Sequence, residues 1–164
     1  MPLLSSIARR KKMQYFLETV PRSAAILEIG CGDGWVAEYF RKNGYSNYTG
    51  LDIHPPADVV GDIKNWRNLG LSAGSFDIIV AFEVIEHTDC LKDCWDLLRP
   101  GGRLLLTTPV PQADWLLKIL EAIGLSQKRG TPHTHLTRLK NISVFRQKNI
   151  ITVGLLSQWG VLTK

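Results

Sequence analysis

The chain has 164 residues, of which 45% are apolar and 21% charged, and its net charge is +5 at pH 7. This composition is typical of one globular domain and argues against a disordered chain. No apolar run approaches the roughly 20 residues of a membrane-spanning helix, and the short apolar start does not resemble a signal peptide. We therefore expect a single domain over residues 1–164, without a membrane span and located in the cytoplasm.

Hydrophobic periodicity predicts that helices and strands alternate from the N-terminus to residue 109. Pro21 ends the first helix and Gly44 caps the second. The alternation predicts an α/β fold with a doubly wound, mostly parallel Rossmann-like sheet and helices on both faces. In chain order we expect a helix over 5–20, a strand over 25–29, a helix over 35–43, strands over 48–51, 57–60 and 76–82, a helix over 91–98 and a strand over 103–108.

Beyond residue 109 the alternation changes. We read residues 110–135 as an insertion over the edge of the sheet, because loops at such edges often carry function. The domain then divides into an N-terminal helix (1–21), a cofactor-binding core (22–109), the insertion (110–135) and a C-terminal helix with edge strands (136–164). The elements expected here are helices over 114–123 and 136–148, a strand over 150–156 and a short last strand over 160–163.

The segment LEIGCGDG at residues 27–34 is the most informative part of the chain. It predicts a buried strand followed by a turn in which Gly30, Gly32 and Gly34 let a ligand approach the backbone. A dinucleotide fingerprint has the spacing G-x-G-x-x-G, whereas this turn has G-x-G-x-G. Glu28 also precedes the turn, where its charge would repel a pyrophosphate. The turn therefore favours a cationic nucleotide-type cofactor over NAD.

Two further acids follow strand ends. Asp52 comes after the second strand, where an acid in a nucleotide-binding sheet accepts hydrogen bonds from a ribose diol. The alternative is a turn or capping residue, since Pro55 and Pro56 follow closely. Glu83 comes directly after the strand over 76–82. Right-handed crossovers bring these strand ends to one edge, so the glycine turn and both acids are expected to lie there.

Five segments together carry a family resemblance: LEIGCGDG (27–34), LDI (51–53), GDI (61–63), FDIIVAFEVIEH (76–87) and LRPGGRLLLTTP (98–109). In this order and spacing, the chain resembles class I S-adenosylmethionine-dependent methyltransferases of the small-molecule branch that includes the ubiquinone-biosynthesis type. The resemblance covers roughly residues 25–109. The family usually ends in two full antiparallel strands, but few residues follow Asn149 here, so we expect a short antiparallel edge.

The resemblance also implies which residues bind S-adenosylmethionine. The turn would cradle the methionine part, acids would hold the ribose and the adenine amino group, and apolar side chains would lie against the adenine ring. The implied contacts are Glu28, Gly30, Cys31, Gly32 and Gly34 for methionine, Asp52 for ribose, Ile53, Asp62 and Ile63 for adenine, and Phe82 and Glu83 near the methionine end and the acceptor entrance.

Methyl transfer from a sulfonium is an in-line displacement, so positioning and exclusion of water come first. A base is needed only for an acceptor that must lose a proton. His87 and His135 are the candidates, because histidine titrates near neutral pH. For each, a packing or loop role is the alternative. A metal held by His133 and His135 with Glu83 or Glu86 is not favoured, since nothing in the spacing demands it.

The preferred acceptor is a small organic molecule. The basic cluster (residues 9–12) leaves RNA or a protein open as the acceptor, but we favour a solvated helix face. The chain also lacks the N/D-P-P-Y tetrapeptide of many nitrogen methylators after the strand over 76–82. A non-catalytic cofactor-binding protein is the third reading. The short C-terminal region suggests a small acceptor cap or one from another chain, which leaves a homodimer open.

Overall fold

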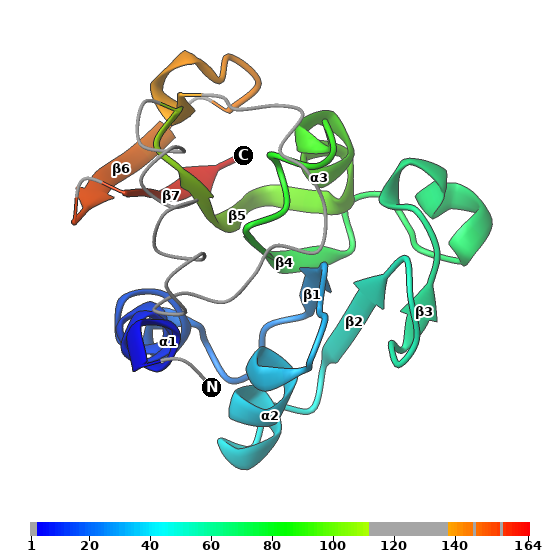
Figure 1. The fold of residues 1–164 in the computed structure, drawn as a ribbon. Coiled ribbons are helices and arrows are strands. Elements are labelled where there is room, and N and C mark those ends of the chain that lie inside the picture. Colours follow the sequence, from blue (N-terminus) through cyan, green and yellow to red (C-terminus); the bar gives the residue numbers. More distant parts are fainter. Residues whose placement is uncertain (1–2, 112–137, 146, 155) are drawn as a thin grey trace.

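The computed structural model describes residues 3–111, 138–145, 147–154 and 156–164. These residues contain a seven-stranded sheet with the order β3-β2-β1-β4-β5-β7-β6 (Figure 1). The pairs from β3 to β5 are parallel, and the pairs that involve β7 are antiparallel. The strands are β1 (Ile26–Ile29), β2 (Tyr48–Asp52), β3 (Val59–Val60), β4 (Phe76–Phe82), β5 (Leu98–Pro109), β6 (Gln147–Val153) and β7 (Ser157–Thr163).

The central strands of the sheet place the predicted site residues at one edge. All four residues of β1 are buried, and β4 beside it is buried over most of its length. Strands covered on both faces are continuously apolar rather than alternating. With β2 and β4 on either side of β1, the glycine turn, Asp52 and Glu83 follow neighbouring parallel strands at the same edge of the sheet. This confirms the predicted fold class.

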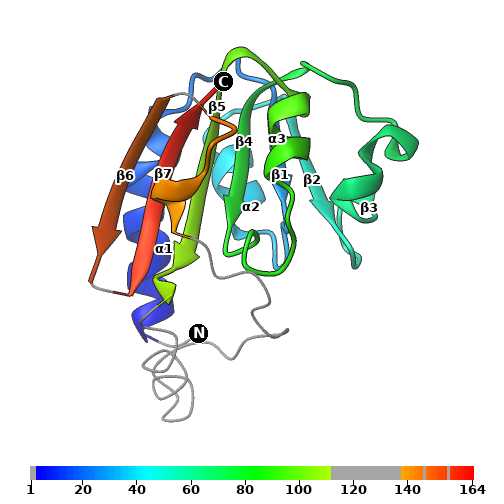
Figure 2. The same ribbon diagram turned by 90° about the horizontal axis from the view of Figure 1, so that it is seen from above.

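One face of the sheet is covered by α1 (Leu3–Tyr15), the short 3₁₀ helix η1 (Leu17–Thr19) and α2 (Trp35–Lys42). Phe16 and Phe40 are fully buried between these helices and the strand residues Ile78 and Leu105. The N-terminal helix is therefore shorter than the predicted 5–20, because the chain tightens into η1 after Tyr15. Figure 2 shows α1 and α2 together on this side.

The opposite face carries the second apolar cluster. It is covered by η2 (Ile63–Leu69), which the sequence did not predict, by α3 (Leu91–Leu97) and by the short 3₁₀ helix η4 (Leu139–Asn141). Trp66, Cys94 and Leu97 are buried there against Ile79 and Leu104. Helices thus cover both faces of the sheet, as predicted (Figure 2).

The predicted helix over 136–148 is wrong for the residues that the structure describes. Only η4 is helical there, and β6 begins at Gln147. The misleading signal is the three-residue spacing of Leu139, Ile142 and Phe145, which are all buried. They pack on the sheet from a non-helical segment, because Ile142 has an extended backbone (φ −66°, ψ 118°).

The antiparallel edge is longer than expected. Both β6 and β7 have seven residues, and their register pairs Gln147 with Thr163 and Val153 with Ser157. The chain therefore builds the two antiparallel strands whose completeness was in doubt. The predicted helix over 114–123 and the insertion beyond Pro111 lie outside the described residues.

Candidate cofactor site

The glycine turn joins β1 to α2 and is held by two neighbouring segments. Gly30, Gly32 and Gly34 have φ values of 72°, 47° and 74°, which non-glycine residues rarely adopt. The Gly30 amide donates to the Leu51 carbonyl at 2.8 Å. A Cβ on Gly30 would lie 2.8 Å from a methyl carbon of Val84. Glycine is thus required both by the backbone and by close packing.

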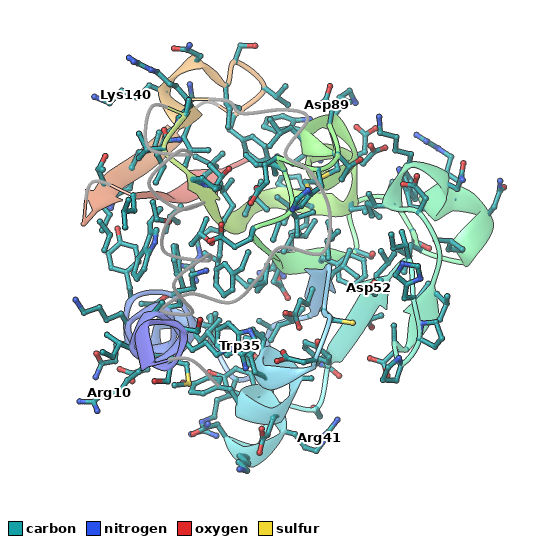
Figure 3. The ribbon with its side chains drawn as sticks, viewed as in Figure 1. Arg10, Trp35, Arg41, Asp52, Asp89 and Lys140 are labelled. Atoms are coloured by element: carbon teal, nitrogen blue, oxygen red, sulfur yellow. The ribbon has the colours of Figure 1, made fainter. Side chains whose placement is uncertain are left out.

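Asp52 lies directly against this turn. Its Oδ2 accepts a hydrogen bond of 2.9 Å from the Gly32 amide, and its Oδ1 accepts one of 3.0 Å from the His54 amide. Ile53 is 59% exposed beside it. In Figure 3, Asp52 on β2 and Trp35 at the start of α2 lie on either side of β1. The structure therefore brings together the turn and the acid that the sequence placed in one site.

Glu28 is buried below the turn. The Tyr48 hydroxyl donates a hydrogen bond to its Oε2. Burial raises the pKa of Glu28 to about 8; the Tyr48 hydrogen bond opposes this shift, while the charges of Asp33 and Asp52 add to it. At neutral pH this carboxyl is mostly protonated. Glu28 therefore adds little of the negative charge that its position in the sequence suggested. Its role in the structure is that of a buried hydrogen-bonding group.

Cys31 lies between β1 and β2. Its side chain is buried, and a Cβ on Gly50 of β2 would lie 3.2 Å from its sulfur. Burial, together with the nearby Glu28 and Asp52, raises the pKa of the thiol to about 11. The sulfur is therefore a neutral packing group, and the main chain of Cys31, which donates to Leu51 at 3.2 Å, helps to shape the turn.

The GDI segment caps a helix. The Asp62 Oδ1 accepts a hydrogen bond of 2.9 Å from the Lys64 amide and so begins η2. Ile63 is buried in the core beside Trp66, in contrast to the exposed Ile53. Asp62 and Ile63 thus have structural roles, and their contacts with adenine remain a prediction.

Glu83 follows β4 with an unusual backbone, since its φ is 57°. Its Oε1 accepts hydrogen bonds from the Lys12 ammonium at 2.8 Å and from the Thr107 hydroxyl at 2.7 Å. The Glu83 side chain is 43% exposed. Its partial desolvation would by itself raise its pKa, but the Lys12 ammonium and these hydrogen bonds outweigh that effect and hold the pKa below its usual value. Glu83 is therefore a fixed negative charge at the edge of the sheet.

Two basic residues of α1 belong to this site, which the sequence analysis missed. Arg9 lies 2.6 Å from Asp33 and Lys12 lies 2.8 Å from Glu83, with side chains only 19% and 11% exposed. The cations also lie over the rings of Trp35 and Phe82, which stack on each other. The signal was the three-residue spacing, which puts both side chains on one helix face. That half of the basic cluster is not a solvated face.

Glu86 was considered in the sequence only as an unfavoured metal ligand, and its buried position was not predicted. It lies in the turn after β4, is fully buried, and accepts a hydrogen bond of 3.0 Å from the Thr108 hydroxyl of β5. The signal in the sequence was the pair of threonines that ends the apolar run of β5, because buried hydroxyls need partners.

Of the two candidate bases, the structure describes only His87. His87 is half-buried directly after Glu86, and its amide donates to Val84 at 2.9 Å. His135 lies outside the described residues, as does His133. Within the described part of the chain, no group of three histidine, cysteine or acidic side chains is arranged to hold a metal.

The fold and this site define a cofactor-binding α/β domain of the Rossmann-like class, with acids and backbone amides facing one edge of the sheet. The chain belongs to the methyltransferase domain family, whose model matches residues 6–151. The resemblance to class I methyltransferases is thereby confirmed.

Two relatives and a solved structure illustrate the range of this family. The chain is 29% identical over 134 residues to a ubiquinone biosynthesis O-methyltransferase of Xanthomonas axonopodis pv. citri, covering 69% of this chain and 56% of the relative. It is 32% identical over 105 residues to a ribosomal protein L11 methyltransferase of Burkholderia thailandensis, covering 58% and 35%. Its fold matches a SAM dependent methyltransferase from Archaeoglobus fulgidus with a TM-score of 0.67 and 15% identity, covering 96% and 94%.

The chain spans about half the length of the ubiquinone-biosynthesis relatives that it matches. In the part of the chain that the structure describes, none of the helices has the length and apolar character needed to span a membrane.

Proposed function

We propose that this chain binds S-adenosylmethionine and transfers its methyl group to a small organic acceptor. The observation that carries the proposal is the Asp52 carboxylate held 2.9 Å from the Gly32 amide, beside the exposed Ile53. A carboxylate next to an apolar side chain suits a ribose diol and an adenine ring. Near the turn, the charges of Asp33 and Glu83 are balanced by Arg9 and Lys12, and the case against a pyrophosphate rests on the G-x-G-x-G spacing of the turn.

Different residues would bind different parts of the cofactor. The backbone around Gly30, Gly32 and Gly34, with Glu28 and Cys31 beneath, would hold the methionine part, and Asp52 the ribose. Ile53, Asp62 and Ile63 would surround adenine. Phe82 and Glu83 would lie where the acceptor enters. When bound, the cofactor supplies a methyl group on a positively charged sulfur, which is a good leaving group. The chain orients this group and excludes water, which is sufficient for an in-line displacement.

An acceptor that must lose a proton would need a base, and His87 and His135 are our candidates. The small-molecule class is supported by the ubiquinone-biosynthesis relatives. We also propose a reducing compartment such as the cytoplasm, because the three cysteines are free, buried thiols. A homodimer stays a proposal as well.

A macromolecular acceptor is the second candidate, favoured by the relative named for ribosomal protein L11. Arg9 and Lys12 weaken it, because both cations are turned toward acids of the site rather than outward. A third reading is cofactor binding without transfer.

The test is calorimetric titration with S-adenosylmethionine and S-adenosylhomocysteine, with NAD as the control. Micromolar binding of the first two without binding of NAD supports the cofactor, and methylation of phenolic or amine acceptors in a subsequent screen supports the reaction. Salt-dependent binding of RNA would favour the macromolecular candidate, whereas binding without product would favour the non-catalytic one. Absence of binding contradicts the proposal.

A further inference from the structure

Arg9 of helix α1 contacts the residues on both sides of Gly34 in the glycine turn. Its Nη2 donates a hydrogen bond of 2.6 Å to the Asp33 carboxylate, and its guanidinium carbon lies 5.4 Å from the centre of the Trp35 ring. Gly34 is the N-cap residue of α2, and no side-chain hydrogen bond caps this end of the helix. A contact from α1 thus supports the point where the turn becomes a helix.

The same face of α1 holds the segment that follows β4. Lys12, three residues after Arg9, lies 2.8 Å from the Glu83 carboxylate and 5.3 Å from the centre of the Phe82 ring. The rings of Phe82 and Trp35 stack on each other, with 5.9 Å between their centres and 14° between their planes. The segments that follow β1 and β4 are therefore joined to each other and to one face of α1.

The two cations are more deeply buried than the acids that they hold. The side chains of Arg9 and Lys12 are 19% and 11% exposed, whereas those of Asp33 and Glu83 are 53% and 43% exposed. A ligand at this edge of the sheet would therefore meet the carboxylates before it reaches the cations. This arrangement lets Arg9 act on a ligand through Asp33 rather than by direct contact.

We propose that Arg9 is a positioning residue, which holds Asp33 and Trp35 and thereby fixes the glycine turn in the conformation that binds the cofactor. The turn needs such support, because its three glycines give it more backbone freedom than other residues would. A turn that is ordered before the ligand arrives binds more tightly, since less conformational entropy is lost on binding. Only the gain in cofactor affinity rests on the proposed function, because the support of the turn is a property of the ligand-free protein.

The first experiment measures hydrogen exchange in the ligand-free chain, for wild type and for Arg9→Met. Methionine has neither the charge nor the hydrogen-bond donors of arginine. We expect the amides of residues 30–34 to exchange about fivefold faster in Arg9→Met, while those of β7 keep their rate. Arg10→Met is the matched control, since Arg10 is exposed and points away from the sheet (Figure 3). An unchanged rate for the turn, or a rise that extends equally to β7, overturns the proposal.

Calorimetric titration with S-adenosylhomocysteine then tests the link to the cofactor. We expect Arg9→Met to bind this ligand about fivefold more weakly than wild type, and Arg9→Lys, which keeps the charge, to bind within about twofold of wild type. The ligand is chosen because it has no sulfonium charge that would respond directly to Asp33. Arg10→Met should bind as wild type does. If Arg9→Lys binds as weakly as Arg9→Met, the ion pair is not the cause and the proposal is overturned.

A double-mutant cycle with Asp33→Asn separates positioning from direct contact with the ligand. If Arg9 acts through Asp33, the double variant Arg9→Met/Asp33→Asn binds about as weakly as either single variant, about fivefold below wild type. If the two side chains contact the ligand independently, their effects multiply to about twenty-five-fold, which overturns the proposal. If exchange of the turn rises in Arg9→Met but wild type binds neither S-adenosylmethionine nor S-adenosylhomocysteine, the support of the turn is upheld and it is the proposed function that fails.

Discussion

The Lys12 ammonium of helix α1 lies 2.8 Å from the Glu83 carboxylate at the end of β4, although 71 residues separate them in the chain. Lys12 also lies 5.3 Å from the centre of the Phe82 ring. A carboxylate and an aromatic face are surroundings that suit any cation. In this ligand-free state, helix α1 therefore supplies a cation to the part of the site where we place the sulfonium.

Replacing Lys12 by methionine should shift the preference between cofactor and product. The substitution keeps the apolar stem but removes a positive charge next to Glu83. S-adenosylmethionine carries a sulfonium charge and S-adenosylhomocysteine does not, so the affinity ratio should move toward the former by about threefold, or about 0.6 kcal/mol. Calorimetric titration with each ligand measures the ratio. Lys11→Met on the exposed side of α1 is the matched control, and an unchanged ratio in Lys12→Met would place the sulfonium elsewhere.

Replacing Asp52 by alanine should weaken cofactor binding without unfolding the domain. We expect a loss of about 1–3 kcal/mol, or roughly five- to 150-fold in Kd, because hydrogen bonds from the ribose lose their charged acceptor. Asp89→Ala is the control, since Asp89 is an exposed acid outside the candidate site (Figure 3). Equal affinities of the two variants in calorimetric titration would remove Asp52 from the ribose site.

The exposed Ile53 offers a test of the adenine contact. It is 59% exposed, so Ile53→Ala should cost little stability, yet it should weaken cofactor binding by about 1 kcal/mol if the side chain packs on the ring. Ile151→Ala is the matched control, because Ile151 is also an exposed isoleucine but lies on β6 at the opposite end of the sheet from β3. Thermal unfolding measures the stability of both variants, and calorimetric titration measures their affinity for the cofactor. A Kd for Ile53→Ala equal to that of Ile151→Ala contradicts the contact.

The core of the fold could be predicted because its signals are local. The apolar run of β4 and the alternating glycines after β1 each determine their own structure, and parallel pairing then brings Asp52 and Glu83 to the same edge. The predicted helix over 136–148 is wrong because its signal was also local, whereas its conformation depends on long-range packing. Leu139, Ile142 and Phe145 have helical spacing, but the sheet surface beneath them, which no local pattern reports, decides their conformation.

The missed part of the site depends on long-range contacts. Nothing near Lys12 in the sequence indicates that its partner is Glu83, so a solvated helix face was the natural interpretation of the basic cluster. The charge of Glu28 was misjudged because burial, which determines its pKa, follows from the assembled sheet. Sequence patterns located the acids, but only the packed structure indicates which of them are charged.

The glycine turn can be tested with a matched pair of positions. Gly34 and Gly74 both have positive φ, 74° and 64°, and at both a Cβ would meet no atom within 4 Å. Alanine should therefore cost each position a similar strain of about 1–2 kcal/mol. Only Gly34→Ala should also weaken cofactor binding, because its Cβ would enter the space above the turn. Urea unfolding measures the first effect and calorimetric titration the second; equal binding by both variants would mean that no ligand approaches Gly34.

The buried carboxyl of Glu28 should make stability depend on pH. Its pKa is about 8 in the folded chain and near 4.5 when exposed, so between these values the folded state holds a proton that the unfolded state has released. Stability from this group is complete below about pH 4.5 and is lost as the pH rises through about 8, with a slope of about −1.4 kcal/mol per pH unit. The glutamine of Glu28→Gln does not titrate. From about pH 5.5 to about pH 7.5, the free energy of unfolding of this variant should therefore fall by about 1–3 kcal/mol less than that of the wild-type chain. Urea unfolding at both pH values measures this difference. The exposed Glu38→Gln should keep the wild-type dependence, and an equally steep fall in Glu28→Gln would show that Glu28 is ionised in the folded chain.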